Sequence, residues 1–155
     1  MDERLDEIDT RKDKRAPRAI KESVRKSMRG NKSKHTLPEL LLRKMLFSRG
    51  VRGYRLHWKI AGNPDLAFVG KKIGIFIHGC FWHRCPHCKL PVPKRNTAFW
   101  EEKFYKNMRR DERNKQAASK LGWKSLIIWE CELKKNPAFM IKKILKAISK
   151  EPKIL

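Results

Sequence analysis

Three histidines and three cysteines crowd into the sixteen residues from Ile73 to Cys88, which read IGIFIHGCFWHRCPHC. An imidazole, with an ordinary pKa of about 6.5, suits the activation of water at neutral pH, and thiolates suit zinc. The pair Pro64-Asp65 lies just upstream, and Cys131 lies downstream. Together these residue types predict a metal-assisted centre that cleaves phosphodiester bonds, beside a structural zinc site.

The cysteines have a spacing that suits one tetrahedral zinc ion. Cys80, Cys85 and Cys88 form C-x4-C-x2-C, and Cys131 follows an apolar run much later in the chain. Four thiolates at about 2.3 Å would surround Zn2+ and leave no open position for water, so this zinc would be structural. His87 is an alternative ligand. The competing interpretation is that Cys131 is a small buried residue and that the other three cysteines bind nothing.

Asp65 is the candidate ligand for a second, catalytic metal. It follows the turn-like sequence GNP and precedes an apolar run, which places its carboxylate at the mouth of a strand. Mg2+ takes hard oxygen ligands and needs only one or two protein carboxylates, because phosphate and water complete its shell. His78 and His83 follow the next strand, and either ring could activate water. An ordinary turn and buried structural histidines are the alternatives.

The aromatic pair Phe81-Trp82 lies between Cys80 and His83. In most sequences such a pair belongs to a hydrophobic core. An aromatic pair that projects from a rigid, basic loop can instead stack on nucleic-acid bases or wedge between them. The local pattern leaves both uses open.

The charge of the chain indicates a polyanionic partner. Its 155 residues contain 39 Lys and Arg against 16 Asp and Glu, a formal charge of +23, and nucleic acid is the partner that such a balance favours. No apolar run is long enough to span a membrane. The N-terminus is charged from its start and lacks the apolar stretch of a secretory signal, so we expect a cytoplasmic, nucleoid-associated protein.

The pattern of apolar residues predicts an α/β fold. Thr36 and Glu39 form a capping box that opens a helix, and Gly50 ends it. Two strand-like runs separated by three residues suit an antiparallel hairpin, and a long helix capped by Thr97 ends at Gly122. The expected elements are helices at residues 37–49 and 98–121 and from Pro137, and strands at 54–58, 66–69, 73–77 and 124–129. This order implies a mixed sheet flanked by helices.

The ends of the chain differ from its centre. Residues 15–35 carry eight Lys or Arg against the single acid Glu22. We interpret residues 1–35 as a basic arm that is flexible without DNA, and a solubilising tail is the alternative. Residues 36–150 would form a single domain, because 40% hydrophobic content suffices for one core. Residues 151–155 would be a short tail.

The run HGCFWH at residues 78–83 resembles a motif of the very short patch repair (Vsr) DNA mismatch endonucleases. Pro64-Asp65, Phe99-Trp100 and the sequence WEC at 129–131 extend the resemblance, which covers about residues 24–132. It implies a restriction-endonuclease-like fold and an enzyme that nicks one strand 5′ to the mispaired T of a T·G mismatch. Such mismatches arise by deamination of 5-methylcytosine.

The resemblance also assigns roles to individual residues. Asp65 and the main-chain carbonyl of Ile77 would bind Mg2+, His83 would be the general base with His78 in support, and Glu39 would be an active-site acid. The zinc ligands would be Cys80, Cys85, Cys88 and Cys131. DNA would be contacted by an aromatic wedge of Phe81, Trp82 and Trp100 and by Met28 inserted from the arm. Asn107 and Asp111 would help around the site.

Some features depart from the resemblance. The wider nuclease superfamily has an acid and a lysine on the strand at residues 73–77, which offers neither, and Ile77 replaces a threonine of the family. The alternatives are a zinc-stabilised DNA-binding module without catalysis and a nicking nuclease without T·G specificity. We expect duplex DNA with a mismatch as the partner, mismatch-repair proteins as further partners, and a monomer.

Overall fold

The computed structural model describes residues 21–149, and the chain divides into two units, Met1–Asn31 and Lys32–Leu155. In the first unit, α1 (Glu22–Arg29) begins with an acid that pairs with Arg25 at 3.1 Å. The sequence analysis did not predict this helix. The predictions for residues 1–20, the tail at 151–155 and the Met28 side chain lie outside the described residues. The division into an arm at 1–35 and a domain at 36–150 stays a prediction.

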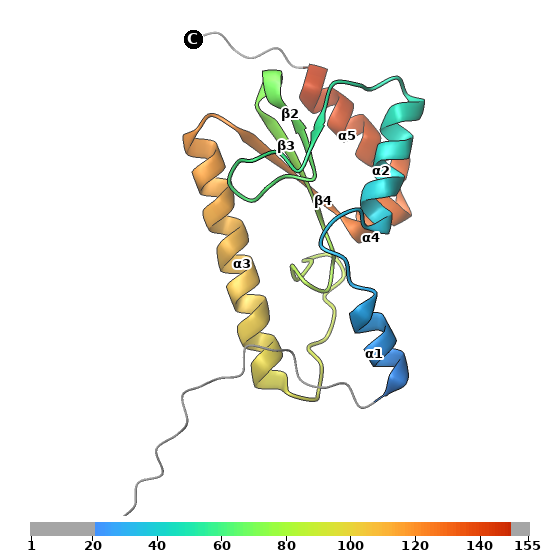
Figure 1. The fold of residues 1–155 in the computed structure, drawn as a ribbon, viewed down its shortest axis with the longest axis vertical. Helices are drawn as coiled ribbons and strands as arrows, with labels where there is room; N and C mark the ends of the chain where they lie inside the picture. Colours follow the sequence, from blue (N-terminus) through green and yellow to red (C-terminus); the bar gives the residue numbers. More distant parts are fainter. Residues whose placement is uncertain (1–20, 150–155) are drawn as a thin grey trace, which may run out of the picture. The chain divides into compact units, whose positions relative to one another are not determined.

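The second unit is built on a four-stranded sheet (Figure 1). Its strands lie side by side in chain order: β1 (Arg55–Leu56), β2 (Leu66–Phe68), β3 (Ile73–His78) and β4 (Lys124–Trp129). The first two pairings are antiparallel, and β3 pairs with β4 in parallel. The predicted mixed sheet is confirmed, because the sheet contains both the antiparallel pair of β2 and β3 and the parallel pair of β3 and β4.

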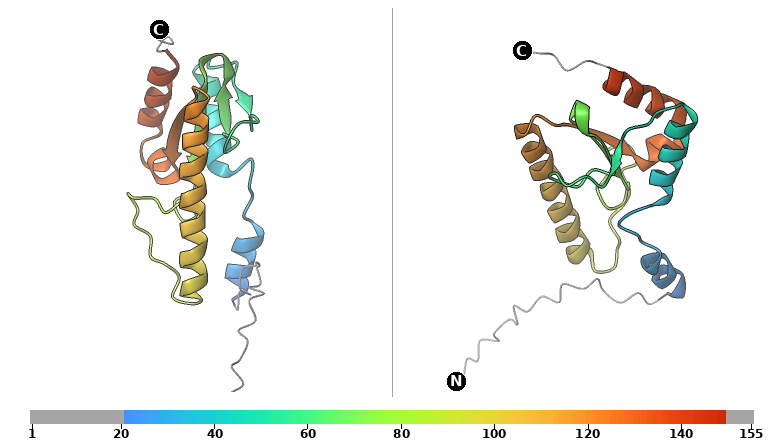
Figure 2. Two further views of the ribbon diagram at one scale, coloured as in Figure 1. Left: turned by 90° about the vertical axis from the view of Figure 1, so that its left-hand side faces the viewer. Right: turned by 45° about the horizontal axis from the view of Figure 1, so that its top comes forward.

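Helices flank this sheet on two sides, as Figure 1 and Figure 2 show. The long helix α3 (Thr97–Lys120) lies on one side. On the other side lie α2 (Leu37–Ser48), α4 (Glu130–Lys135) and α5 (Pro137–Ser149). The predicted α/β class is therefore confirmed for the described residues.

Local chemistry explains the ends of α2. The Thr36 hydroxyl accepts a hydrogen bond from the Glu39 amide at 3.5 Å and donates one to the Glu39 carboxylate at 3.0 Å. That carboxylate also accepts the His35 amide at 2.8 Å, so it satisfies a backbone donor that the helix leaves free. Gly50 follows the helix with a φ of 75°, which a glycine adopts without strain.

Three sequence predictions need correction. Thr97 does not cap α3: Asn96 occupies the cap position, and the Thr97 hydroxyl donates to the carbonyls of Pro93 and Lys94. β1 is shorter than predicted, because His57 has a φ of 47° that ends the extended backbone. The helix α4 was not predicted, since six residues give too little periodicity to detect.

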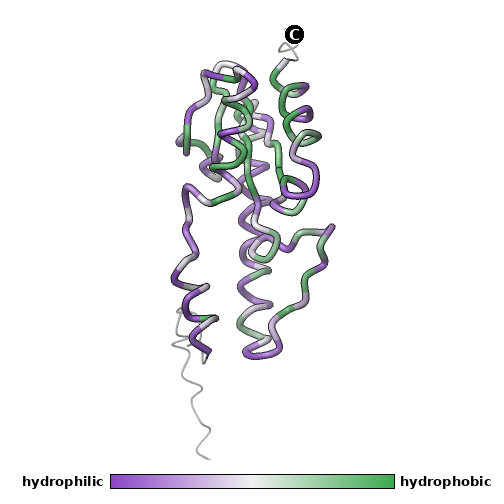
Figure 3. Tube along the Cα trace, turned by 90° about the vertical axis from the view of Figure 1, so that its right-hand side faces the viewer, coloured by the Kyte–Doolittle hydropathy of each residue, from purple (hydrophilic) through white to green (hydrophobic). Residues whose placement is uncertain are grey.

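The hydrophobic core lies between the sheet and the helices α2, α4 and α5. Its fully buried side chains include Leu42 and Leu46 from α2, Ile75 and Ile128 from the sheet, and Leu133, Ile141 and Ile144. Figure 3 shows the same concentration of hydrophobic residues on the strands and on α5. Within residues 21–149, no helix has the length and apolar character needed to cross a bilayer.

Adjacent leucines on α2 test this core. Leu42 is completely buried, whereas Leu41 is 40% exposed. We expect Leu42→Ala to lower the free energy of unfolding by about 2–5 kcal/mol, because it leaves a cavity between α2 and the sheet. Leu41→Ala should cost less than about 1 kcal/mol. Urea unfolding of both variants measures the difference, and equal losses would show that α2 does not pack as described.

Candidate active site

The parallel pairing of β3 with β4 brings two distant segments to the same edge of the sheet. Each residue of β3 faces one residue of β4, and the last pair is His78 with Trp129. Parallel strands end at the same edge, so the residues that follow them also lie close together. Cys80 and Cys131 each stand two residues beyond this pair. The sheet therefore assembles one side of the cysteine cluster.

The four cysteines form a compact group. The sulfur atoms of Cys80, Cys85, Cys88 and Cys131 all lie within 4.8 Å of one another. Those of Cys85 and Cys131 are 3.6 Å apart, close to the edge of about 3.8 Å of a tetrahedron with Zn–S bonds of about 2.3 Å. The arrangement fits four sulfur ligands around one zinc ion.

Further contacts support this ligand set. The Cys131 amide donates to the sulfur of Cys80 at 3.4 Å. Burial raises the pKa of the Cys80 thiol. At Cys85 burial also acts to raise the pKa, but the backbone hydrogen bonds from Cys88 and His87 and the side-chain contacts with Cys131 and Cys80 together lower it. The His87 ring, which was the alternative ligand, lies outside the cluster and 3.5 Å from the Glu132 carboxylate.

Asp65 lies where β2 begins, and its carboxylate bridges to β3. One carboxylate oxygen accepts a hydrogen bond from the Ile77 amide at 2.7 Å. The Asp65 carbonyl accepts a hydrogen bond from the His57 amide at 3.3 Å. The pKa of Asp65 is raised to about 6, chiefly by burial, and the Ile77 hydrogen bond opposes this shift. The negative charge of Glu39 raises it further, and the charge of His83 lowers it. Asp65 is therefore close enough to both groups for their charges to act on it.

His83 is held by a carboxylate from α3. Its Nδ1 atom and an oxygen of Asp111 are 2.5 Å apart. Because an ionised carboxylate only accepts, Nδ1 carries the proton and Nε2 is the free nitrogen. Burial acts to raise the pKa of Asp111, but its hydrogen bond to His83 and the charge of that ring lower it overall. The pair is arranged as a base and the group that orients it.

His78 and Asn107 fix the surroundings of His83. The His78 ring stacks on the His83 ring with centroids 3.9 Å apart and an interplanar angle of 11°. Burial and the charge of His83 lower the pKa of His78 to about 4, so the buried ring is neutral at physiological pH. The Asn107 side chain, which is buried on α3, donates to the Trp82 carbonyl at 3.0 Å. These contacts hold the loop on α3.

The three aromatic residues of the candidate wedge, Phe81, Trp82 and Trp100, contact one another in one cluster of rings. Phe81 contacts Trp82, Trp100 and Phe104 at centroid distances of 5.1, 5.5 and 5.1 Å. Phe81, Trp82 and Trp100 are half-buried, and Phe104 beneath them is buried. The structure thus brings together the three aromatic residues predicted from the sequence, between the loop and the start of α3.

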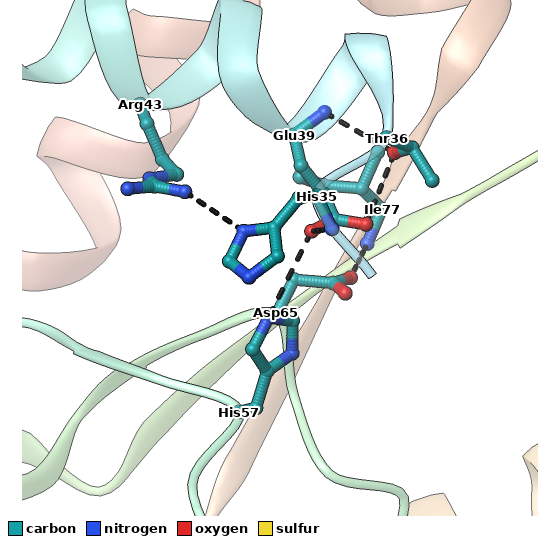
Figure 4. Close-up of polar contacts among 7 residues, drawn as sticks. All are labelled: His35, Thr36, Glu39, Arg43, His57, Asp65 and Ile77. Carbon is teal, nitrogen blue, oxygen red and sulfur yellow. Dashed lines mark hydrogen bonds and ion pairs between the residues drawn. The ribbon is translucent and has the colours of Figure 1, made fainter. Parts of the chain in front are cut away.

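Glu39 and two histidines form a group beside Asp65. Glu39 is only 4% exposed, and its side chain extends from α2 toward the His57 ring and the Asp65 carboxylate (Figure 4). His57 and His35 were not singled out from the sequence. Neither histidine is part of a recognisable motif. The periodicity of the sequence also does not predict that His57, in the loop after β1, lies next to α2.

Comparison with known proteins gives consistent matches. The sequence model of the family described as DNA mismatch endonuclease Vsr matches residues 18–90. Type II nicking enzyme V.NmeAIP of Neisseria meningitidis is 45% identical over 102 residues, which are 66% of this chain and 73% of the relative. The DNA mismatch endonuclease Vsr of Escherichia coli is 39% identical over 110 residues, 70% of each chain. Type II nicking enzyme V.HpaIIP of Haemophilus parainfluenzae is 37% identical over 137 residues, which are 88% of this chain and 95% of the relative.

The fold, the site and these similarities define a DNA endonuclease, a hydrolase whose substrate is DNA. The chain belongs to the Vsr family of DNA mismatch endonucleases.

The cysteine cluster gives a direct prediction about zinc. We expect the purified protein to contain one zinc per chain and Cys131→Ser to lose most of it, because the remaining three sulfurs no longer complete the tetrahedron. His87→Ala is the matched control and should keep its zinc, since His87 pairs with Glu132 instead. Elemental analysis after gel filtration measures both. Loss of zinc in the His87 variant alone would overturn the four-cysteine assignment.

Proposed function

We propose that this endonuclease nicks one strand of duplex DNA 5′ to the mispaired T of a T·G mismatch, by Mg2+-dependent hydrolysis, in the repair of deaminated 5-methylcytosine. The observation that carries the catalytic part is that Asp65 and His83 lie near the same end of β3. Asp65 accepts a hydrogen bond from the Ile77 amide of that strand, and His83 follows the strand and pairs with Asp111. The mismatch part is supported by the E. coli relative, which is named a DNA mismatch endonuclease.

The residues around Asp65 fit a hard divalent cation. Two carboxylates, Asp65 and Glu39, lie near each other away from bulk water, and the charge of Glu39 disfavours the ionisation of Asp65. A divalent cation would compensate both charges. We assign Asp65 and the main-chain carbonyl of Ile77 as its ligands, with Glu39 as a nearby acid, because carboxylate and carbonyl oxygens suit Mg2+.

The proposed mechanism uses His83 as general base. Its free Nε2 accepts a proton from the attacking water, and Asp111 on Nδ1 holds the ring and stabilises the imidazolium that forms. The neutral His78 ring stacked on His83 keeps it in place. Mg2+, when bound, supplies positive charge that stabilises the extra negative charge on the phosphate. Attack of the water on phosphorus would break the bond to the 3′ oxygen, which would leave as a 3′ hydroxyl after taking a proton from solvent. The product would be a nick with a 5′-phosphate.

Recognition of the mismatch would use the aromatic cluster. We propose that Phe81, Trp82 and Trp100 wedge into the DNA and that Met28 inserts from the N-terminal arm. A poorly stacked mispair costs less to open than a matched step, by roughly a few kcal/mol. The charge of +23 supplies attraction to the phosphate backbone. We further propose a monomer in the bacterial cytoplasm, associated with the nucleoid and assisted by mismatch-repair proteins.

A second candidate function is nicking without T·G specificity. It is favoured by the names of the relatives from Neisseria and Haemophilus, which are given as Type II nicking enzymes without mention of a mismatch. Incubation of the zinc-loaded protein and Mg2+ with T·G, matched and branched duplexes separates the two functions. Nicks confined to the strand 5′ of the mispaired T support the first function. Equal nicking of the matched duplex supports the second.

Asp65→Ala tests the metal ligand. We expect the rate of Mg2+-dependent nicking of a T·G duplex to fall by at least about 10³-fold, because the cation loses its carboxylate. Binding of the same duplex should remain, since the basic surface is unchanged. Single-turnover nicking and gel-shift titration measure the two quantities. A variant that nicks at the original rate would exclude Asp65 as the metal ligand.

Asp111→Asn tests the positioning of His83. The amide can orient toward Nδ1 but carries no charge to stabilise the imidazolium, so we expect nicking to slow by about 10²-fold or more. Zinc content and duplex binding should not change. Glu112→Gln is the matched control on the next position of α3, where the carboxylate accepts a hydrogen bond from the Gln116 side chain at 2.9 Å. A similar loss in both variants would mean that α3 has been disturbed generally.

A further inference from the structure

A third cluster of metal-ligating side chains lies beside the proposed active site. His35, Glu39 and His57 each offer one ligand atom, and these atoms lie within 4.8 Å of one another. The residues come from separate segments: the loop before α2, the first turn of α2 and the loop after β1. Neither histidine has a role in the proposed mechanism.

The His57 ring is placed as a ligand rather than as a hydrogen-bond donor. Its Nε2 atom is buried and has no hydrogen-bond partner among the described residues. The Glu39 carboxylate lies 4.0 Å from this atom, which is too far for a hydrogen bond. A buried polar atom without a partner costs free energy, which a bound cation would recover.

The backbone fixes this position. His57 has a φ of 47°, a left-handed conformation that is uncommon for residues other than glycine. Its amide donates to the Asp65 carbonyl at 3.3 Å, which ties the loop to the start of β2. Opposite it, the Glu39 carboxylate is anchored by the His35 amide and the Thr36 hydroxyl. Two of the three candidate ligands are therefore held before any cation binds.

His35 completes the group. Its ring meets the His57 ring edge to face with centroids 5.3 Å apart, and it is exposed to solvent. Arg43 donates to its Nδ1 atom at 3.2 Å, which leaves the proton of the neutral ring on Nε2. A cation must therefore replace either the arginine at Nδ1 or the proton at Nε2. Figure 4 shows these side chains around the Glu39 carboxylate.

We propose that His35, Glu39 and His57 bind a first-row transition-metal cation, distinct from the four-cysteine zinc and from the Mg2+ assigned to Asp65. Two imidazoles and one carboxylate are a ligand set for Zn2+, Co2+ or Ni2+ rather than for Mg2+. With bonds of about 2.0–2.1 Å, tetrahedral ligand atoms lie about 3.3 Å apart. The present distance of 4.0 Å between His57 Nε2 and the Glu39 carboxylate would have to shorten by about 0.7 Å to reach that value. An exposed ring at the edge gives the cation an entry path.

The site would also touch the proposed active site through a shared residue. Glu39 is the carboxylate whose charge raises the pKa of Asp65. A cation on Glu39 would place positive charge next to the Asp65 carboxylate. The binding proposal does not depend on the catalytic assignment, because it concerns the affinity for a cation and can be measured without DNA.

Cobalt titration, in excess Mg2+, of protein that holds one zinc per chain tests the proposal. We expect one equivalent of Co2+ to bind with d–d absorption bands but no sulfur-to-cobalt charge-transfer band, since zinc keeps the four cysteines occupied. His57→Ala and His35→Ala should each weaken this binding by more than about 100-fold, because loss of a direct ligand costs more than loss of a supporting contact. Zinc content and circular dichroism verify that these variants fold.

Two controls separate this site from the other histidines. His83→Ala and His87→Ala should bind Co2+ like the original protein, because neither ring belongs to the cluster. Arg43→Leu should bind more tightly, because it removes both the competing donor on His35 and a repelling positive charge. Unchanged cobalt binding in His57→Ala, or loss in His83→Ala instead, would overturn the proposal. Binding that is not tightened by Arg43→Leu would remove His35 from the ligand set.

Discussion

The parallel pairing of β3 with β4 is the constraint on which the candidate active site depends. It sets His78 opposite Trp129 and brings Cys80 and Cys131 to the same edge of the sheet, although 51 positions separate them in the chain. The four sulfur atoms gather beside the loop that carries His83, and the His83 ring pairs with Asp111 on α3 and stacks on His78. A one-residue slip of either strand would turn these side chains to the opposite face.

The second feature of the site is that negative groups gather away from water in a strongly basic protein. The charge of Glu39 raises the pKa of Asp65, while the Ile77 amide, the Thr36 hydroxyl and the His35 amide donate hydrogen bonds to the two carboxylates. Such a group is stable only with compensating positive charge. The architecture therefore suits divalent cations on the inside and the phosphate backbone on the outside, which agrees with membership of an endonuclease family.

Much of this could be predicted from the sequence, and the parts that could not have physical reasons. The hairpin of β2 and β3, the long helix α3 and the four-cysteine group follow from apolar periodicity, turn residues and spacing, and the structure confirms them. The Thr97 cap was wrong because Asn96 adopts a left-handed backbone that a propensity argument does not foresee. The His57–Glu39 contact was missed because it depends on tertiary packing of a loop against α2.

The account rests on one claim, that Asp65, Ile77 and His83 surround a single divalent cation at the edge of the sheet. Paramagnetic broadening by Mn2+, which takes the same oxygen ligands as Mg2+, tests it directly in the zinc-loaded protein without DNA. We predict that substoichiometric Mn2+ selectively broadens the amide signals of Asp65 and Ile77 and the ring signals of His83, and that excess Mg2+ restores them. Sharp signals from Asp65 and Ile77, with broadening centred elsewhere, would contradict the account.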